Sequence, residues 1–136
     1  MSELALKLIA ENKKTKSEFL DLGRCGLTSV PDEIAELVWL KRLNFAGSYW
    51  AVEDGNQSYV QSANRGKANK LADLTPLAKL ISLTTLYLDG TQVSDVTPLA
   101  KLTSLNTLNL YGTQVADLSP LKPLLELGVS VKWSDK

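Results

Sequence analysis

Two aspartates in the second half of the chain have a spacing that suggests chemistry. Asp95 and Asp117 are 22 residues apart, and each lies two residues before a hydroxyl residue that is followed by proline. Carboxylates repeated at a regular interval suit metal binding or acid–base catalysis. Acidic side chains at turns, however, usually accept nearby backbone amides. We therefore expect Asp95 and Asp117 to cap turns rather than to act on a substrate.

Other catalytic and metal-binding groups are scarce in the sequence. It contains no histidine and a single cysteine, Cys25. Histidine is the commonest general base and transition-metal ligand, and a thiolate zinc site needs several cysteines. The sequence also lacks the glycine-rich loop ending in lysine that binds phosphates in nucleotide-hydrolysing enzymes. These absences predict a protein that is not an enzyme and has no cofactor and no bound metal.

Length and charge limit the remaining possibilities. The chain has 136 residues, which suffices for one modest core, so we expect a single domain over residues 1–136. Fifteen basic and fifteen acidic residues give no net charge that would attract nucleic acid or a membrane. The first residues, MSELALKLIAENKK, contain neither a basic leader nor a long apolar run. We therefore predict a cytoplasmic location and no membrane partner.

A constant offset of 22 residues relates two stretches of the chain. LYLDGTQVSDVTPLAKLTSL begins at Leu86, and LNLYGTQVADLSPLKPLLEL begins at Leu108. Such an offset is typical of a solenoid, in which successive coils present the same apolar side chains to each other. The Leu-x-Leu step predicts a short strand. The Ser/Thr-Pro pair predicts a helical turn on the opposite side, with Thr97 and Ser119 as N-caps.

The spacing Leu-x-x-Leu-x-Leu-x-x-(Asn/Thr/Cys)-x-Leu resembles that of the leucine-rich repeat family. The DLxPLxxL form is similar to the short repeats of bacterial internalins and of a phosphatase regulatory subunit, and FLDLGRCGLTSVPDEIAELVWL is an earlier, related repeat. The resemblance implies an α/β solenoid whose parallel sheet lines a concave face, with Cys25 buried at the family's asparagine position. It places strands near Phe19–Leu22, Leu43–Phe45, Leu86–Leu88 and Leu108–Leu110.

A solenoid needs cover at both ends, because each coil buries its faces only against its neighbours. Ser2 is expected to cap an amphipathic helix, so residues 1–16 are predicted to form an N-terminal helical cap. The repeats then occupy residues 17–124.

The C-terminal segment has a different apolar pattern. In GVSVKW, apolar residues alternate at Val129, Val131 and Trp133, and they miss the next apolar positions of the repeat. Residues 125–136 are therefore expected to form a C-terminal cap with a closing strand whose register is shifted by one residue.

The repetition is interrupted within the coil that begins at Leu43 by about 21 surplus residues. This insertion, residues 49–68, contains none of the repeat leucines but includes Tyr49, Trp50 and Tyr59. Asp54-Gly55 predicts a hairpin turn that pairs Trp50 with Tyr59. The insertion is either a structural flap or a recognition element, since insertions in repeat proteins often lie on the binding face.

The outward positions of the predicted strands form a mixed, polar surface with two tyrosines, which is typical of a protein-binding face rather than a catalytic cleft. We therefore predict a non-enzymatic module that binds a protein or peptide through the concave face and the insertion. The predicted partner-binding residues are Arg42, Asn44, Tyr49, Trp50, Tyr59, Tyr87, Asp89, Asn109 and Tyr111.

Other interpretations remain open at this point. One is a solvated concave face without a partner, and a homo-oligomer through the exposed solenoid ends is also possible. PLLELGVSVKW is similar to the end of the repeat region in Roco-type proteins, which implies a regulatory or sensing domain of a larger GTPase-linked protein. The least favoured interpretation is single-stranded nucleic-acid binding, with stacking on the insertion's aromatic residues and phosphate contacts from Arg65, Lys67 and Lys70.

Overall fold

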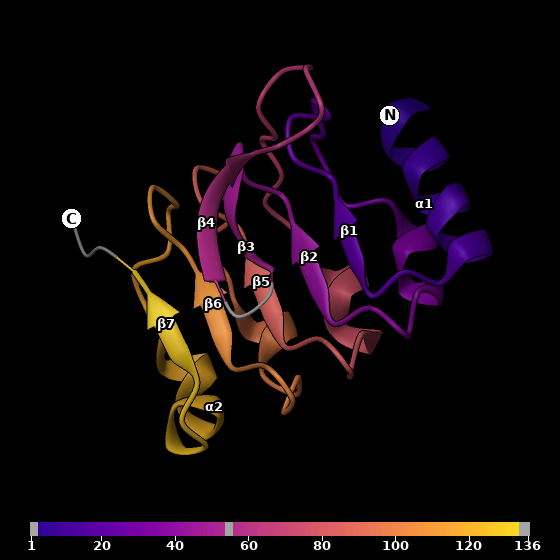
Figure 1. Cartoon of the computed structure of the whole chain (residues 1–136). Helices are drawn as coiled ribbons and strands as arrows, with labels where there is room; N and C mark the ends of the chain where they lie inside the picture. Colours follow the sequence, from indigo (N-terminus) through magenta and orange to yellow (C-terminus); the bar gives the residue numbers. More distant parts are fainter. Residues whose placement is uncertain (1–2, 54–55, 134–136) are drawn as a thin grey trace.

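The repeats form a stack of coils with strands on one side and helical turns on the other. The computed structural model describes residues 3–53 and 56–133, with the backbone alone for residues 51–53 and 56. Within these residues one parallel sheet has the order β1-β2-β5-β6-β7 (Figure 1). Its strands are β1 (Phe19–Asp21), β2 (Arg42–Asn44), β5 (Thr85–Tyr87), β6 (Thr107–Asn109) and β7 (Ser130–Lys132). The predicted leucine-rich repeat solenoid is confirmed.

Equivalent leucines lie side by side in neighbouring strands. Leu20 is opposite Leu43, Leu43 is opposite Leu86, and Leu86 is opposite Leu108. These leucines are buried in one continuous core together with the leucines of the helical turns. Each of the predicted strands lies within one residue of its expected position, because the repeat spacing fixes which leucines must stack.

Short 3₁₀ turns and one short α-helix form the opposite side of the coils. Each turn buries an apolar side chain against the core, as Ile34, Leu77, Leu99 and Leu121 do. The elements are η1 (Asp32–Glu36), η2 (Thr75–Lys79), η3 (Thr97–Leu99), η4 (Ser119–Leu121) and α2 (Lys122–Glu126).

The capping of these turns differs from the sequence prediction. Thr97 and Ser119 are the first residues of their turns rather than N-caps. The backbone amide of Thr97 donates to the carboxylate of Asp95 at 2.9 Å, and that of Ser119 donates to Asp117 at 2.9 Å. The aspartates thus cap turns, as predicted, and because they take the first amide the hydroxyl residues are not needed as caps.

The duplicated Gly-Thr-Gln-Val block makes the same turn in two coils. Gly90 and Gly112 have φ angles of +75° and +72°, which glycine adopts without a steric penalty. The next residues, Thr91 and Thr113, each donate a hydroxyl to the carbonyl three residues earlier at 2.7 Å. The block recurs because the turn geometry recurs.

Helix α1 (Glu3–Thr15) covers the N-terminal end of the solenoid (Figure 1). It buries Ala5, Ile9 and Asn12. The Asn12 amide accepts the indole N–H of Trp39 at 2.7 Å and donates to the Ser17 carbonyl at 3.1 Å, which fixes the helix to the first coil. The predicted N-cap Ser2 lies outside the described residues. None of the described helices is long and apolar enough to cross a membrane.

Strand β7 closes the other end with the predicted change of register. Val131 pairs with Leu108, an offset of 23 residues instead of 22. Val129 is buried, and the indole N–H of Trp133 donates to the Val115 carbonyl at 2.9 Å. The shift lets the alternating apolar residues of this segment cover the last coil.

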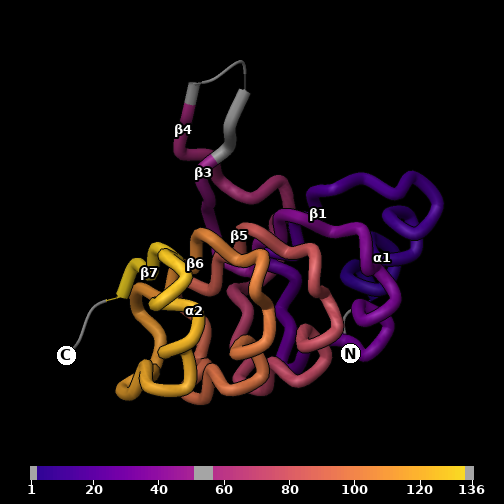
Figure 2. The backbone as a smooth tube through the Cα atoms, turned by 90° about the horizontal axis from the view of Figure 1, so that it is seen from below, coloured from indigo at the N-terminus to yellow at the C-terminus, as the bar shows by residue number. Residues whose placement is uncertain are grey.

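The insertion forms a β-hairpin of β3 (Ser48–Glu53) and β4 (Asn56–Gln61). The hairpin rises from the strand side of the solenoid, away from the helical turns (Figure 2). Trp50 pairs with Tyr59 in this ladder, which confirms the predicted register. The turn predicted at Asp54-Gly55 lies outside the described residues.

Candidate binding groove

The hairpin and the concave strands together line one groove, with a volume of about 660 Å³. We call it the hairpin groove. Side chains from the hairpin strands β3 and β4 and from strands β2, β5, β6 and β7 line this groove, so it depends on residues far apart in the sequence. The predicted partner-binding residues that line it are Arg42, Trp50, Tyr59, Tyr87, Asp89, Asn109 and Tyr111.

Three aromatic side chains of the groove are open to solvent. Trp50, Tyr59 and Tyr111 are 42%, 61% and 48% exposed. Trp50 and Tyr59 lie across the hairpin with ring centroids 5.2 Å apart, and the Tyr59 hydroxyl bonds to the Ser48 hydroxyl. Exposed aromatic side chains gathered in a concavity are the usual anchors of interfaces.

The backbone carbonyl of Trp50 attaches the hairpin to the solenoid. It accepts the Arg42 guanidinium at 2.6 Å and the Tyr87 hydroxyl at 3.2 Å. The Arg42 guanidinium also lies 5.0 Å from the centre of the Phe19 ring. Arg42 and Tyr87 therefore have a structural part: they hold the hairpin over the sheet.

Tyr49 lies between the hairpin and the sheet. Its ring is 5.0 Å from that of Phe19 and 6.4 Å from that of Tyr87. Tyr49 is partly buried and Tyr87 is 5% exposed. The expectation that Tyr87 is an open binding residue of the concave face is corrected, because the hairpin residue Tyr49 lies over it.

Asn44 needs the same correction. It is fully buried and therefore offers no surface to a partner. Its side-chain amide donates to the Asp21 carboxylate at 3.0 Å and to the Ala46 carbonyl at 2.9 Å. An outward strand position is normally exposed, but here the chain turns back at Ala46, whose amide donates to the Asn44 Oδ1 at 3.0 Å.

Asp21 anchors the end of the insertion and was not predicted as a site residue. Its carboxylate accepts the Ser62 hydroxyl at 2.9 Å, the Ala63 amide at 3.1 Å and the Gly23 amide at 2.9 Å. Asn64 donates to the Gly23 carbonyl at 2.9 Å. These bonds fix the point at which the hairpin returns to the solenoid.

Asn69 is a second structural residue that the sequence prediction missed. It is buried, donates to the carbonyls of Leu22 and Phe45 at 2.8 and 2.9 Å, and accepts the Leu27 amide at 2.8 Å. A signal was present, because Asn69 precedes Thr91 by the repeat length of 22 residues. Asn69 therefore occupies the repeat's asparagine position, displaced along the chain by the insertion.

The floor of the groove holds two buried acceptors without a donor. Among the described residues, Oδ1 of Asp89 and Oδ1 of Asn109 have no hydrogen-bond partner. Asn109 is 7% exposed, and burial raises the pKa of Asp89 to about 6. Leaving a buried acceptor unpaired costs about 1–3 kcal/mol, so this part of the groove favours an occupant that brings N–H donors.

Cys25 is not a nucleophile in this structure. It is buried, as predicted, and desolvation together with the nearby Asp21 carboxylate raises the pKa of its thiol to about 11. A thiol with a raised pKa carries little thiolate at neutral pH and is correspondingly unreactive.

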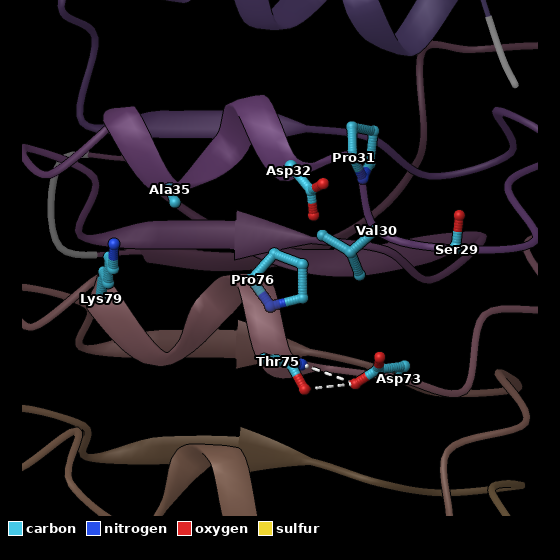
Figure 3. Close-up of a pocket in the computed structure, with 9 residues that line it drawn as sticks. All are labelled: Ser29, Val30, Pro31, Asp32, Ala35, Asp73, Thr75, Pro76 and Lys79. Atoms are coloured by element: carbon cyan, nitrogen blue, oxygen red, sulfur yellow. Dashed lines mark hydrogen bonds between the residues drawn. The ribbon is translucent and has the colours of Figure 1, made fainter.

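A second hollow, of about 500 Å³, lies between η1 and η2 on the side of the helical turns (Figure 3). Val30, Pro31 and Pro76 line it, and its Asp73 carboxylate accepts the amide and the hydroxyl of Thr75 at 2.9 and 2.6 Å. These bonds lower the pKa of Asp73. The Asp73 carboxylate is therefore already paired within its own turn.

The column of turn aspartates continues in the same way along the solenoid. Hydrogen bonds from Thr97 and Ser119 lower the pKa values of Asp95 and Asp117. Among the described residues no group of three or more histidine, cysteine, aspartate or glutamate side chains could hold a metal ion. Asp73, Asp95 and Asp117 each cap a turn.

The basic residues considered for nucleic-acid binding lie apart from the aromatic ones. The segment that carries Lys67 and Lys70 runs along the first coil, where the Lys67 carbonyl accepts the Gly26 amide at 2.9 Å. Arg65 lines a small hollow with Arg24 and Asn64. Among the described residues, the lining of the hairpin groove includes none of the three basic side chains.

Comparison with known proteins agrees with the fold. Residues 81–123 match a family model described as leucine-rich repeats in two copies. No curated protein sequence matches the chain.

Similar solved structures come from Listeria monocytogenes. An internalin C2 is 30% identical, with a TM-score of 0.57 over 78% of this chain and 37% of the internalin. An internalin F is 28% identical, with a TM-score of 0.54 over 85% of this chain and 26% of the internalin. The chain thus spans well under half the length of either internalin. Its repeat pattern, its parallel sheet and these similarities make it an internalin-like leucine-rich repeat protein.

Proposed function

We propose that the chain is a non-enzymatic module that binds an extended segment of a partner protein in the hairpin groove. Leucine-rich repeat and internalin-like folds are protein-interaction modules in general, and the fold supports that class of function. The observation that carries the proposal is the shared position of Trp50, Tyr59 and Tyr111, which are exposed and line the same groove.

The shape of the groove favours a peptide over a small molecule. Its floor is made by side chains from the concave face of several strands, and it is open to solvent. Its lining combines aromatic rings with hydroxyl and amide groups. Small-molecule sites usually enclose most of the ligand in an apolar cavity. An extended peptide can instead lie across the strands and place separate side chains on separate rings.

A display selection tests the proposal while the partner is still unidentified. The whole chain serves as bait for a random peptide library, and enriched peptides are then measured by fluorescence anisotropy. Trp50→Ala and Tyr111→Ala should each weaken binding, since hot-spot aromatics typically contribute about 2 kcal/mol or more. Ile81→Ala is the matched control, because Ile81 is 64% exposed but does not line the groove.

The outcome also separates this proposal from its alternatives. Peptides that bind equally well to the wild type and to both groove variants would place recognition elsewhere and contradict the proposal. The proposal is also contradicted if no peptide is enriched while single-stranded oligonucleotides bind with a strong dependence on salt. Such a dependence indicates contacts with phosphate groups.

A further inference from the structure

We propose that the peptide bound in the hairpin groove presents one basic side chain, arginine or lysine, to Asp89 and Asn109. This inference rests on the proposed function, because it names the chemistry of the partner at that site. The positive group would donate to the two acceptors on the floor, and its aliphatic stem would lie against the Tyr111 ring.

The unpaired acceptors are the first argument. Oδ1 of Asp89 and Oδ1 of Asn109 find no donor among the described residues, although both side chains line the groove. Asn109 is more than nine-tenths buried, so water reaches it poorly. Both oxygens are buried, so leaving them unpaired costs free energy that a donor from an occupant would recover.

Two hydrogen-bond donors that line the groove are already in use. The Tyr87 hydroxyl and the Arg42 guanidinium both donate to the Trp50 carbonyl. Lys132, on β7, lines the groove but forms no ion pair among the described residues. The hairpin therefore engages two of the groove's donors, and the acceptors of Asp89 and Asn109 have no partner among the described residues.

The aromatic rings suit a cation. Trp50, Tyr59 and Tyr111 surround the same space, and the faces of aromatic rings attract arginine and lysine groups. The chain already contains one such contact, where the Arg42 guanidinium lies over the Phe19 ring. Arginine should bind better than lysine, because its planar group can stack on a ring and donate to two acceptors together.

The charges around Asp89 determine which residues can flank the basic residue of the bound peptide. Arg42 on β2 and Lys132 on β7 line the same groove and would repel further positive groups. The other titratable side chains of the lining are Tyr59, Tyr87 and Tyr111. The preferred segment thus carries a single basic residue with neutral or acidic neighbours, and a run of basic residues should bind less well.

The direct test uses defined peptides and the whole chain. N-acetyl-Gly-Ser-Arg-Ser-Gly amide is titrated into the ¹⁵N-labelled protein, in parallel with peptides that carry citrulline or glutamate in place of arginine. Citrulline keeps the shape of arginine and removes its charge. The arginine peptide should bind at least about tenfold more tightly than the citrulline peptide, with shifts at Asp89, Asn109 and Tyr111.

Two variants complete the test. Asp89→Asn should reduce the affinity for the arginine peptide to that for the citrulline peptide. Asp95→Asn makes the same chemical change at an exposed turn outside the groove and should leave the preference intact. A variant that fails to fold would lose the dispersed amide spectrum, so the titration itself reports folding.

The possible failures are distinguishable. If peptides from the display selection bind through Trp50 and Tyr111 without enrichment of basic residues, and Asp89→Asn changes nothing, the proposed function stands and this inference is wrong. If no peptide binds the groove at all, both are wrong. Concentration-dependent shifts at the same residues without peptide would identify a second copy of the chain as the occupant and would also overturn the inference.

Discussion

The hydroxyl of Tyr87 donates to the backbone carbonyl of Trp50 at 3.2 Å, so a strand of the solenoid holds the hairpin that interrupts the repeats. The same carbonyl accepts the Arg42 guanidinium. This double contact is the reason that an insertion without repeat leucines has a defined position over the sheet. It also links binding to stability, because any residue that holds the hairpin shapes the groove.

Removing the Tyr87 hydroxyl should loosen the hairpin selectively. Tyr87→Phe keeps the buried ring and loses one hydrogen bond, so the hairpin should lose about 0.5–1.5 kcal/mol of local stability. Hydrogen exchange of the β3 and β4 amides should accelerate while the amides of Leu86 and Leu108 keep their protection. Uniform acceleration over the whole chain would show that the hairpin and the solenoid unfold together.

Truncating a stacked leucine should affect the entire fold. Leu108 is fully buried between Leu86 and Val131, so Leu108→Ala should lower the free energy of unfolding by about 2–5 kcal/mol. Leu127→Ala is the control, because Leu127 is 68% exposed and should cost under about 0.5 kcal/mol. Urea unfolding measures both, and equal effects would contradict the assignment of the core.

Asn69 should be one of the most sensitive polar positions. Its side chain makes three buried hydrogen bonds to the backbone of two coils, so Asn69→Ala leaves those groups unpaired. We expect a loss of about 2–4 kcal/mol, as for other broken buried networks. Asn106→Ala, at an exposed position, should be nearly neutral in the same urea experiment. A small effect at Asn69 would mean that the coil closes without this side chain.

The raised pKa of Asp89 predicts how the free energy of unfolding depends on pH. Burial shifts it from 3.8 to about 6, so the folded chain binds the proton more tightly than the unfolded chain does. The free energy of unfolding should therefore fall as pH rises through this interval and stay constant above it. Asp89→Asn removes the cost of burying a charged carboxylate. It should therefore stabilise the chain at neutral pH by about 1–2 kcal/mol, after allowance for solvent screening at this partly exposed side chain.

Urea unfolding of both proteins in neutral and mildly acidic buffer checks this sign. The difference in the free energy of unfolding between the wild type and Asp89→Asn should shrink as the buffer is acidified toward pH 4, roughly the ordinary pKa of an aspartate. Affinity for the arginine peptide should fall over the same range, because protonated Asp89 no longer attracts a cation. Greater stability of the wild type at neutral pH would contradict the prediction.

The solenoid was predictable from the sequence because its pattern repeats. Leucines at fixed offsets determine which strands adjoin, and the alternation of Val129, Val131 and Trp133 indicated the shifted register of β7. The pairing of Trp50 with Tyr59 followed from equal distances to a two-residue turn. These features depend on local spacing alone.

The details of the groove were less predictable because they depend on how the hairpin lies over the sheet. Tyr87 occupies an outward strand position that the hairpin covers, and Asn44 occupies one where its side chain is bonded to Asp21 and Ala46. Asp21 also occupies an outward strand position, but its carboxylate binds the returning chain at Ser62 and Ala63. No repeat pattern carries that information, since the contacts join residues about 40 positions apart.

The affinity of a selected groove peptide for wild-type and Trp50→Ala protein, measured together with the free energy of unfolding of each, tests the central claim most directly. Trp50 is 42% exposed, and the backbone carbonyl that anchors the hairpin survives the substitution. The account predicts a loss of about tenfold or more in affinity with a stability change under about 1 kcal/mol. Unchanged affinity with a loss of several kcal/mol in stability would show that the insertion is a structural flap and that the hairpin groove is not the binding site.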